Sequence, residues 1–466
     1  MENFEECVSE VINFLLQKEE KKANEVIVQY IETHFHMFTT KNDIKSEIWF
    51  YDKGVYRPNG KCFIREIARR ILGNGYTTYR VNQVIAKIEA DTYIEEEKLF
   101  RNNIVEEIPV KNGILNLVTM KISPFTPDKI FFTKIPVTYD KEAKCPKIDK
   151  FFGDVLKYKE DKKLAYEWFG FCLWKNYFIE QFLMLVGNGR NGKGKFMDLL
   201  RRFLGGENVC GLPLSRMNSE SFSISEMFSK LANVAGDNRD FYLKDTETLK
   251  SLIGRDLISG KRKWLSDLNF ENYCKQTFAC NKLPIVYDNT LGFWSKPIVL
   301  EFPYNFLDQE DIDKAVNKKN LKLKDVNIID KITTEEELSG LLNMALEGLK
   351  TIRENEKFST TKGSQEVKDF WIRKSDSFMA FCMDKIIDGE TQVPKRILRK
   401  EFNKYCKEHK VPGTSDTHMK VTLQSLYGAT DLHPAAFGNL CNEYTWDGIN
   451  WACSGLGFES KSEEET

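Results

Sequence analysis

The fold of this chain is decided by the stretch Phe182-Leu-Met-Leu-Val-Gly-Asn-Gly-Arg-Asn-Gly-Lys-Gly-Lys195. Five apolar residues, typical of a buried strand, run directly into a glycine-rich loop with the spacing Gly187-x4-Gly192-Lys193. An amphipathic run follows, with apolar residues at helical spacing: Phe196, Leu199, Leu200, Phe203 and Leu204. A strand, a glycine loop and a helix in this order are the context that a P-loop needs. The sequence therefore predicts an α/β core in which helices flank a parallel sheet.

The loop has the features that hold the phosphates of a nucleoside triphosphate such as ATP. Its glycines let backbone N–H groups close around phosphate oxygens, and the start of the following helix adds its positive dipole end. Lys193 is placed to reach the β- and γ-phosphates. The predicted nucleotide-binding residues are Gly187, Asn188, Gly189, Arg190, Asn191, Gly192, Lys193, Gly194 and Lys195.

One position departs from the usual P-loop pattern. The residue after the lysine is commonly Ser or Thr, whose hydroxyl binds Mg²⁺, but here it is Gly194. Glycine supplies no ligand, so the metal would depend on water and on a carboxylate elsewhere. The alternative is a loop that binds the nucleotide but hydrolyses it poorly.

Two further strand-like runs end in polar residues. The run Leu231-Ala-Asn-Val-Ala-Gly ends at Asp237, a carboxylate suited to holding Mg²⁺, and Asp240 could share that role or activate the attacking water. The run Gln276-Thr-Phe-Ala-Cys ends at Asn281, whose amide could orient the γ-phosphate or the lytic water. The alternatives are a simple turn after the first strand and an Asx-turn before Pro284 in the second.

Between these two runs lies a basic segment with turn signals on both sides. Lys261, Arg262 and Lys263 cluster on a predicted hairpin, and Trp264 adjoins them. Cations beside an aromatic ring suit the backbone and bases of single-stranded nucleic acid. The alternative is a solvated run of charge.

Bulk properties describe a globular protein with a nearly balanced charge. The 466 residues can hold several domains, and the net charge of −1 confines any nucleic-acid surface to a local patch. No stretch has the length of a membrane span, and the acidic start lacks the shape of a signal peptide. The 11 cysteines form no C-x2-C pair, which favours free thiols in a reducing compartment. Cys406 and His409 do not have the spacing of common zinc fingers.

Periodicity and composition divide the chain into five parts. Residues 1–150 form a predicted α+β domain with a hairpin near Gly54, and residues 151–306 hold the P-loop core. Residues 307–365 are charged and predicted to be helical, with a solvated face. Residues 366–455 suit a small winged-helix domain that binds DNA, and residues 456–466 form an acidic tail that is expected to be disordered.

The order of these motifs resembles the superfamily 3 helicases of the poxvirus-type and phage/plasmid primase-helicase group. The motifs are GNGRNGKG, LANVAGD, LKSLIGRDLISGKRK, FACNKLP and DNTLGFWSKPIVLEFPYNF. The segments IWFYDKGVY, VKNGILNLVT and KIPVTYD resemble the domain that precedes the helicase in that group. Tyr405 to Pro412 and Trp446 to Trp451 resemble its C-terminal winged helix, so the resemblance covers most of residues 45–455.

The resemblance implies a homo-hexameric ring that hydrolyses ATP with Mg²⁺ at subunit interfaces and moves 3′ to 5′ along single-stranded DNA. It implies work on forked DNA, beside a primase or polymerase, in replicating a virus, phage, plasmid or other mobile element. The expected location is the host cytoplasm or a viral replication site, away from membranes. By the same resemblance, Lys193 is the Walker A lysine, Asp237 the Walker B acid, Asn281 the sensor, and Lys261 to Lys263 the channel hairpin.

A second position departs from that group. The group usually has two arginines after Phe-Trp, one of which reaches the neighbouring subunit's ATP, but here Phe293-Trp294 is followed by Ser295-Lys296. Lys296 can act as a point charge without the forked geometry of arginine, and the alternative cations are Arg239, Arg255 and Arg262. Residues 1–150 contain no convincing paired-carboxylate motif of a primase.

The sequence thus predicts a DNA-stimulated ATPase and helicase, with two rivals. The first rival is a DNA-binding initiator or loader that uses ATP only to assemble, which Gly194 and Lys296 favour. The second is a P-loop kinase of small molecules, which would have no use for a basic hairpin or a winged domain.

Overall fold

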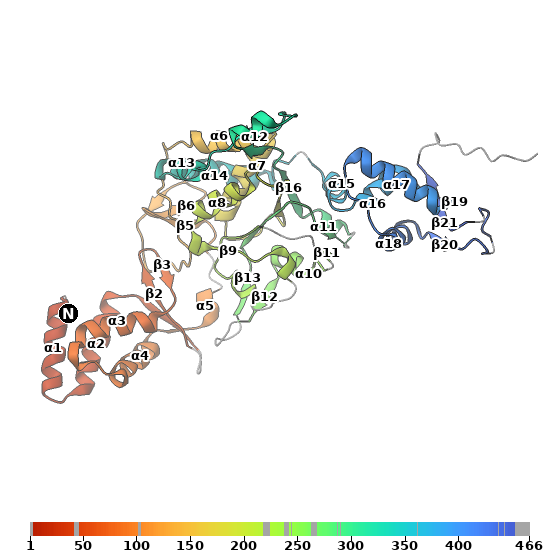
Figure 1. Cartoon of the computed structure of the whole chain (residues 1–466). Coiled ribbons are helices and arrows are strands. Elements are labelled where there is room, and N and C mark those ends of the chain that lie inside the picture. Colours follow the sequence, from red (N-terminus) through yellow and green to blue (C-terminus); the bar gives the residue numbers. More distant parts are fainter. Residues whose placement is uncertain are drawn as a thin grey trace, which may run out of the picture. The chain divides into compact units, whose positions relative to one another are not determined.

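The computed structural model divides into two compact units (Figure 1). The larger unit holds the N-terminal part and the P-loop sheet, and the smaller unit holds most of the C-terminal residues. None of the described helices is long and apolar enough to cross a membrane. The structure describes residues 3–41, 46–100, 104–217, 224–236, 242–243, 245–261, 268–286, 288, 290–360, 362–436, 438–441 and 443–452.

The N-terminal part combines four longer helices and one short helix with two small sheets, and periodicity predicts the third and fourth of these helices. The helices bury a shared apolar core and are α1 (Phe4–Leu16), α2 (Glu20–His34), α3 (Gly60–Leu72) and α4 (Thr78–Asp91). The first sheet has the order β3-β2-β1-β4, with β1 (Met37–Thr40), β2 (Ile48–Asp52), β3 (Val55–Arg57) and β4 (Tyr93–Ile94). Short helix α5 (Glu96–Phe100) precedes an antiparallel sheet of β5 (Glu107–Val110), β6 (Gly113–Asn116) and β7 (Ile122–Ser123).

The centre of the larger unit is a five-stranded parallel sheet with the order β16-β8-β14-β10-β9. Its strands are β8 (Phe182–Val186), β9 (Val209–Cys210), β10 (Ala232–Ala235), β14 (Lys275–Cys280) and β16 (Pro297–Glu301). The chain enters the sheet at β8, moves to the β9 edge, and returns to place β14 and β16 on either side of β8. In parallel sheets a ligand commonly binds at the carboxyl ends of strands beside such a reversal.

Helices cover this sheet, which confirms the predicted fold class. They are α6 (Pro146–Val155), α7 (Lys159–Leu173), α8 (Lys193–Leu204), α13 (Ile328–Ile332) and α14 (Glu335–Asn355) (Figure 1). Helices α7 and α14 lie against each other so closely that a Cβ at Gly170 would come within 2.1 Å of the Ala345 carbonyl oxygen. A Cβ at Gly348 would likewise lie 2.8 Å from the backbone of Glu167. Glycine is therefore required on both sides of this helix crossing.

The larger unit also contains several shorter helices and strands. Helix α10 (Glu247–Ile253) leads into an antiparallel hairpin of β12 (Leu257–Gly260) and β13 (Leu268–Glu271), as predicted for the basic segment. After β16, β17 (Asn305–Leu307) pairs in parallel with β18 (Leu321–Leu323) across α12 (Gln309–Lys314). The purely helical interpretation of residues 307–365 is therefore wrong at β18, because backbone pairing with β17 extends that charged segment.

The smaller unit contains the predicted winged helix. In chain order it has α16 (Ser377–Lys385), β19 (Ile386–Pro394), α17 (Lys395–His409), α18 (Asp416–Tyr427), β20 (Thr430–Leu432) and β21 (Thr445–Trp451). The three strands form an antiparallel sheet with the order β19-β21-β20, and the helices bury a common core against it.

The smaller unit also includes pieces from the middle of the chain. These are β11 (Tyr242–Leu243), which pairs with β15 (Ile285–Val286), and α11 (Leu291–Trp294), which contacts α15 (Ser364–Ser375). The Trp371 indole on α15 donates a hydrogen bond of 2.8 Å to the Pro284 carbonyl oxygen and packs edge-on against Trp294.

Candidate nucleotide-binding site

The glycine loop joins a fully buried strand to an amphipathic helix. All five residues of β8 are buried, and the loop that follows turns through positive φ angles of 87° at Gly189 and 92° at Gly192. A Cβ at Gly187 would lie 2.0 Å from Asn191 Nδ2, so no side chain fits there. Gly192 precedes α8 and has no side chain that could cap the helix, although Asn191 Oδ1 accepts a hydrogen bond of 3.4 Å from the Lys193 N–H. The N–H groups that follow Lys193 are suited to an anion.

The ammonium group of Lys193 lies inside this loop. Its Nζ donates to the Gly187 carbonyl oxygen, to Asn191 Oδ1 at 3.2 Å and to Asn281 Oδ1 at 3.1 Å. Lys193 is buried, with 7% of its surface exposed, and Asn191 is tied in turn to the Phe302 carbonyl oxygen. These contacts place the ammonium group at the mouth of the loop, where phosphate oxygens would compete for it.

Asn281 reaches the loop because of the strand order. It follows β14, which pairs with β8 in parallel, so the carboxyl ends of the two strands lie side by side. The sequence predicted this placement for an amide 88 residues away from Lys193. Strand β10 pairs with β14 on the other side and leads toward Asp237, but Asp237 and Asp240 lie outside the described residues.

Gly194, the departure from the usual pattern, sits in open space. A Cβ there would meet no atom within 4 Å, whereas Cβ atoms at Gly187 and Gly192 would collide with neighbours. Nothing in the described surroundings of Gly194 thus requires glycine, and the missing hydroxyl is not a consequence of crowding.

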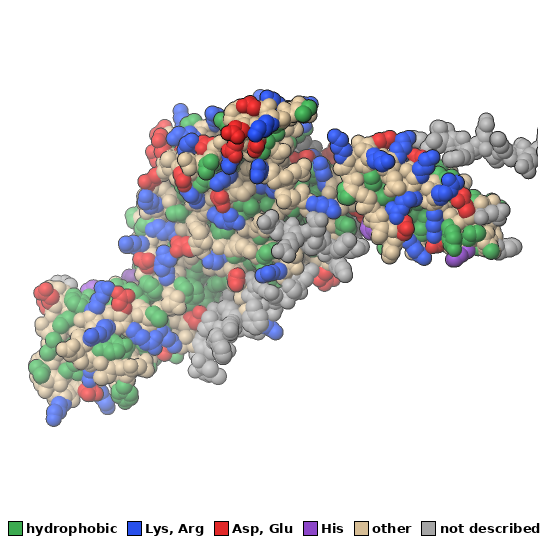
Figure 2. All heavy atoms as spheres, viewed as in Figure 1, with side chains coloured by type: hydrophobic (Ala, Val, Ile, Leu, Met, Phe, Trp, Pro, Cys, Tyr) green, Lys and Arg blue, Asp and Glu red, His purple; other side chains and the backbone are tan. Residues whose placement is uncertain are grey.

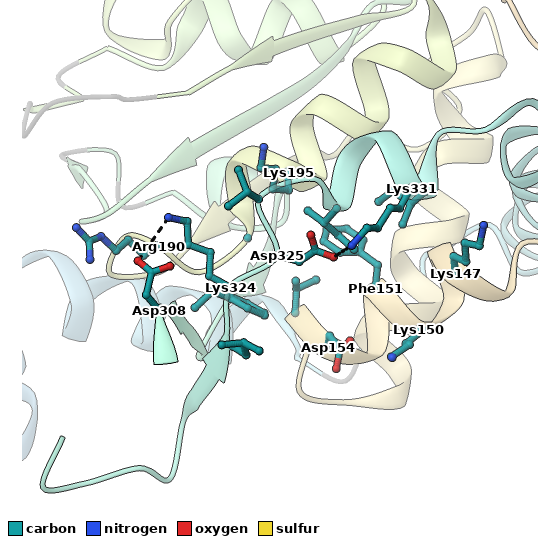
Figure 3. A pocket seen from close by; sticks show the side chains of 17 residues that line it. Lys147, Lys150, Phe151, Asp154, Arg190, Lys195, Asp308, Lys324, Asp325 and Lys331 are labelled. Carbon is teal, nitrogen blue, oxygen red and sulfur yellow. Dashed lines mark hydrogen bonds and ion pairs between the residues drawn. The ribbon is translucent and has the colours of Figure 1, made fainter. Parts of the chain in front are cut away.

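A cavity of about 660 Å³ opens beside the loop (Figure 3). Arg190, Gly192 and Lys195 form its wall on the loop side, and apolar side chains from α6 and from residues 306–332 form much of the rest. These apolar residues are Phe151, Val155, Phe306, Leu323, Val326, Ile328 and Ile332. The Phe306 N–H donates 2.7 Å to the Arg190 carbonyl oxygen, which ties this far wall to the P-loop.

Charged side chains surround the cavity. Asp308 pairs with Lys324 at 3.7 Å and Asp325 with Lys331 at 2.6 Å, while Lys150 and Lys195 also face it and form no ion pair within the described part of the chain (Figure 3). Lys324 and Lys331 remain exposed, as the solvated face predicted within residues 307–365 requires, and together with Asp325 they also line the cavity. The cavity could not be predicted from the charged sequence, because the apolar residues that line it are scattered between the charged ones.

Lys296 lies away from this site. It immediately precedes β16, whereas the P-loop follows the neighbouring parallel strand β8, so Lys296 lies at the amino ends of the strands and the P-loop at their carboxyl ends. Its Nζ pairs with Glu180 at 2.9 Å, and the same carboxylate lies 3.8 Å from Arg255. Lys296 and Arg255 therefore lie near the amino ends of the strands, away from the P-loop of their own chain.

The tip of the basic hairpin is only partly described. Lys261 is exposed directly after β12, while Arg262, Lys263 and Trp264 lie outside the described residues, as does Arg239. In the part of the chain that the structure describes, no three His, Cys, Asp or Glu side chains are grouped so as to hold a metal, Cys406 and His409 included.

Comparisons with known proteins agree with this arrangement. Residues 4–157 match the family described as D5 N terminal like, and residues 185–291 match a family of unknown function, DUF5906. A viral protein named "Putative helicase L207/L206", from Acanthamoeba polyphaga mimivirus, is 26% identical over 149 residues. That match covers 30% of this chain and 15% of the viral protein.

Solved structures also resemble the chain at low sequence identity. The apo C-terminal region of NrS-1 aligns with a TM-score of 0.48 and 12% identity, over 91% of this chain and 98% of that one. A JCV helicase structure aligns with a TM-score of 0.19 and 14% identity, over 47% and 61% of the two chains. With both scores below 0.5, the fold assignment stands on the strand order itself. The N-terminal family match and the viral helicase relative support the same virus and phage primase-helicase group that the motif order indicates.

Proposed function

We propose that this chain is an ATP-dependent helicase that helps to replicate the DNA of a virus, phage, plasmid or other mobile element. The observation that carries the proposal is the contact of Lys193 Nζ with both the Gly187 carbonyl and Asn281 Oδ1. It joins the phosphate loop to the tip of the neighbouring strand, where a γ-phosphate would lie between the lysine and the amide.

The residues around the loop fit a nucleoside triphosphate. In this proposal, the N–H groups of the loop and the start of α8 bind the phosphates, and Lys193 exchanges its present oxygen partners for phosphate oxygens. The adjoining cavity, with apolar walls and with Lys150 and Lys195 at its rim, is large enough for a base and a sugar. Bound Mg²⁺ would neutralise phosphate charge, and Asp237 is its proposed ligand, with Asp240 nearby in sequence.

Strand movement is proposed for a ring of identical subunits, six by the family resemblance. Lys261 to Lys263, with Trp264, would contact single-stranded DNA at a fork, and the winged helix would add a second DNA contact. Lys296 or Arg255, which lie near the amino ends of the strands, would face the nucleotide of the adjacent subunit. A primase or polymerase is the proposed partner, at a replication site in the host cytoplasm.

An ATP-assembled loader is the second candidate, and a specific observation favours it. Lys296 is paired with Glu180 and largely buried, and Gly194 offers no hydroxyl to Mg²⁺. Both features would slow turnover without preventing nucleotide binding, since an arginine finger mainly accelerates the chemical step.

ATP hydrolysis by the purified protein, with and without single-stranded DNA, tests the proposal. We expect DNA to stimulate turnover, and Lys193→Ala to reduce it by about 100-fold or more, because the lysine stabilises charge that develops in the transition state. Lys159→Ala, which removes an exposed lysine from the start of α7, is the matched control. Nucleotide binding without turnover would favour the loader, and hydrolysis unchanged in Lys193→Ala would overturn the site.

A further inference from the structure

The smaller unit carries a stripe of positive charge on one helix. In α17, Arg396, Lys400, Lys404 and Lys407 recur at intervals of three or four residues, which places them on one face. We call these four residues the α17 stripe. Figure 2 shows Lys and Arg side chains gathered over the part of the molecule where α17 lies.

All four side chains of the stripe are exposed, while the opposite face of α17 is buried through Leu398, Phe402, Tyr405 and Cys406. Arg396 has only a long contact of 3.6 Å with Glu443 and remains 77% exposed. Within the described residues, Lys400, Lys404 and Lys407 form no ion pair. The core therefore fixes the orientation of the helix and leaves these three ammonium groups available to an external anion.

Helix α18 and the wing have few cations. Helix α18, which follows α17 in the helix-turn-helix order, carries only Lys420, and that ammonium group lies 3.4 Å from Asp431. The sequence from residue 421 to residue 452, which includes β20, β21 and the wing between them, contains no Lys or Arg. Since binding to nucleic acid depends on neutralising phosphates with Lys and Arg, neither α18 nor the wing can supply the main contact.

We infer that the smaller unit binds the phosphate backbone of nucleic acid through the α17 stripe, rather than reading bases with α18. This inference rests on the proposed function, because it identifies the surface that the winged helix would use. Arg396 and Lys407 are separated by about 16 Å along the helix axis. That length corresponds to roughly five phosphates of one strand in a duplex. Contacts of this kind position a protein on nucleic acid without specifying sequence.

Binding of the full-length chain to fluorescent oligonucleotides, over a series of salt concentrations, tests this inference. The variant is Lys400→Gln/Lys404→Gln/Lys407→Gln, because Gln matches Lys in helix propensity and removes only the charge. The control is Lys314→Gln/Lys318→Gln/Lys319→Gln, which removes the same charge from exposed lysines of the larger unit. Single-stranded and duplex DNA of random sequence are used in separate arms, and ATP turnover without DNA is measured for each protein.

We expect the stripe variant to lower the slope of log K against log salt by about 2.7 for a duplex or about 2.1 for a single strand. The control should change neither slope by a comparable amount, and DNA-free turnover should match that of the wild type in both. Equal slopes for wild type and stripe variant would overturn the inference while leaving the ATPase intact. Absence of turnover in the wild type would instead count against the proposed function. Preferential binding of polyglutamate over both DNAs would identify an acidic polypeptide as the ligand and also overturn it.

Discussion

At the scale of single residues, Gly194 takes the position at which P-loops usually carry a hydroxyl, and the space beside it is empty. Glycine is required at positions 187 and 192, in contrast, because an added Cβ would collide with Asn191 and with Val155, respectively. Packing therefore does not exclude a hydroxyl-bearing side chain at position 194. A Ser or Thr could be introduced there without a steric clash.

We predict that Gly194→Thr raises ATP turnover, by several-fold at limiting Mg²⁺, because it restores a metal ligand at the start of α8. Gly194→Ala is the control, since it adds the Cβ and its helix propensity without the oxygen. Turnover is measured while Mg²⁺ is titrated. An equal rise in the Ala variant would show that helix stability, and not a ligand, limits the reaction.

The buried ammonium group of Lys275 makes the stability of the protein depend on pH. Lys275 at the start of β14 is fully buried, and its Nζ donates to the carbonyl oxygens of Trp174, Asn176 and Tyr273. Burial lowers the pKa of Lys275 to about 7, against about 10.4 in an unfolded chain. Above pH 7 the unfolded state binds more protons, so the free energy of unfolding rises with pH from about 7 upward.

We predict that Lys275→Met flattens this rise between pH 6.5 and 8, as followed by chemical denaturation at each pH. The slope should be reduced rather than abolished, because burial also lowers the pKa of Lys175 to about 7. The variant should also lose about 1–3 kcal/mol at pH 8, since buried carbonyl oxygens lose their donor, and less at pH 6.5. A slope identical to that of the wild type would show that Lys275 is not titrating in this range.

The sequence predicted the contact partners of Lys193 better than those of Lys296. Asn281 lies beside Lys193 because parallel strands bring their carboxyl ends together, and strands and their polar ends can be read from the sequence. The pairing of Lys296 with Glu180 depends on which side chains meet at the amino ends of the strands, and no sequence motif predicts that contact.

At the scale of elements, the crossing of α7 and α14 holds the parallel sheet against its covering helices. Gly170 and Gly348 allow the two backbones to approach, and adding a single carbon at Gly170 would bring it within 2.1 Å of a carbonyl oxygen. By comparison, a Cβ added at Gly153 on α6 would meet no atom within 4 Å.

We predict opposite effects of the same substitution at Gly170 and Gly153. Gly170→Ala should destabilise the larger unit by about 1–3 kcal/mol, because the helices must separate. Gly153→Ala should stabilise it by about 0.5–1 kcal/mol, because alanine loses less backbone entropy in a helix. Urea unfolding followed by circular dichroism measures both. Two changes of the same sign would contradict the close approach of α7 and α14.

Several elements with strong periodicity were predicted correctly, whereas β18, which is formed by tertiary pairing, was not. The amphipathic helices α3, α4 and α8 and the buried strands β8, β10 and β14 follow from apolar spacing alone. Strand β18, with the charged sequence Leu-Lys-Leu, is extended because β17 lies beside it, and its composition does not indicate this.

At the scale of the whole molecule, the chain forms two units that do not correspond to two halves of the sequence. The smaller unit combines β11, residues 282–294 and the described residues from Lys362 onward. The boundary near residue 365 that composition suggests misses the inserted segments, since short apolar pieces such as Ile285–Val286 look the same in either unit.

We predict that Trp371→Ala destabilises the smaller unit by about 3–5 kcal/mol, because Trp371 is fully buried against Trp294. Trp371→Phe should cost less, since it keeps a ring while losing the hydrogen bond to the Pro284 carbonyl. Calorimetry of the full chain should show one transition moving to lower temperature while the transition of the larger unit stays in place. Equal shifts of all transitions would contradict two separately cooperative units.

Residues 282–294 belong to the smaller unit although the chain on both sides of them belongs to the larger unit. This arrangement affects how proteolysis or genetic recombination can separate the two units. Asn281 ends the strand that serves the nucleotide loop, and the very next residue belongs to the smaller unit. A single protease cleavage near residue 361 would therefore not release that unit whole, because part of it remains in the other fragment. For the same reason, one genetic crossover cannot transplant the winged helix together with its complete surroundings into another gene. Exchange of the complete smaller unit would need more than one crossover, because its segments alternate along the chain with those of the larger unit.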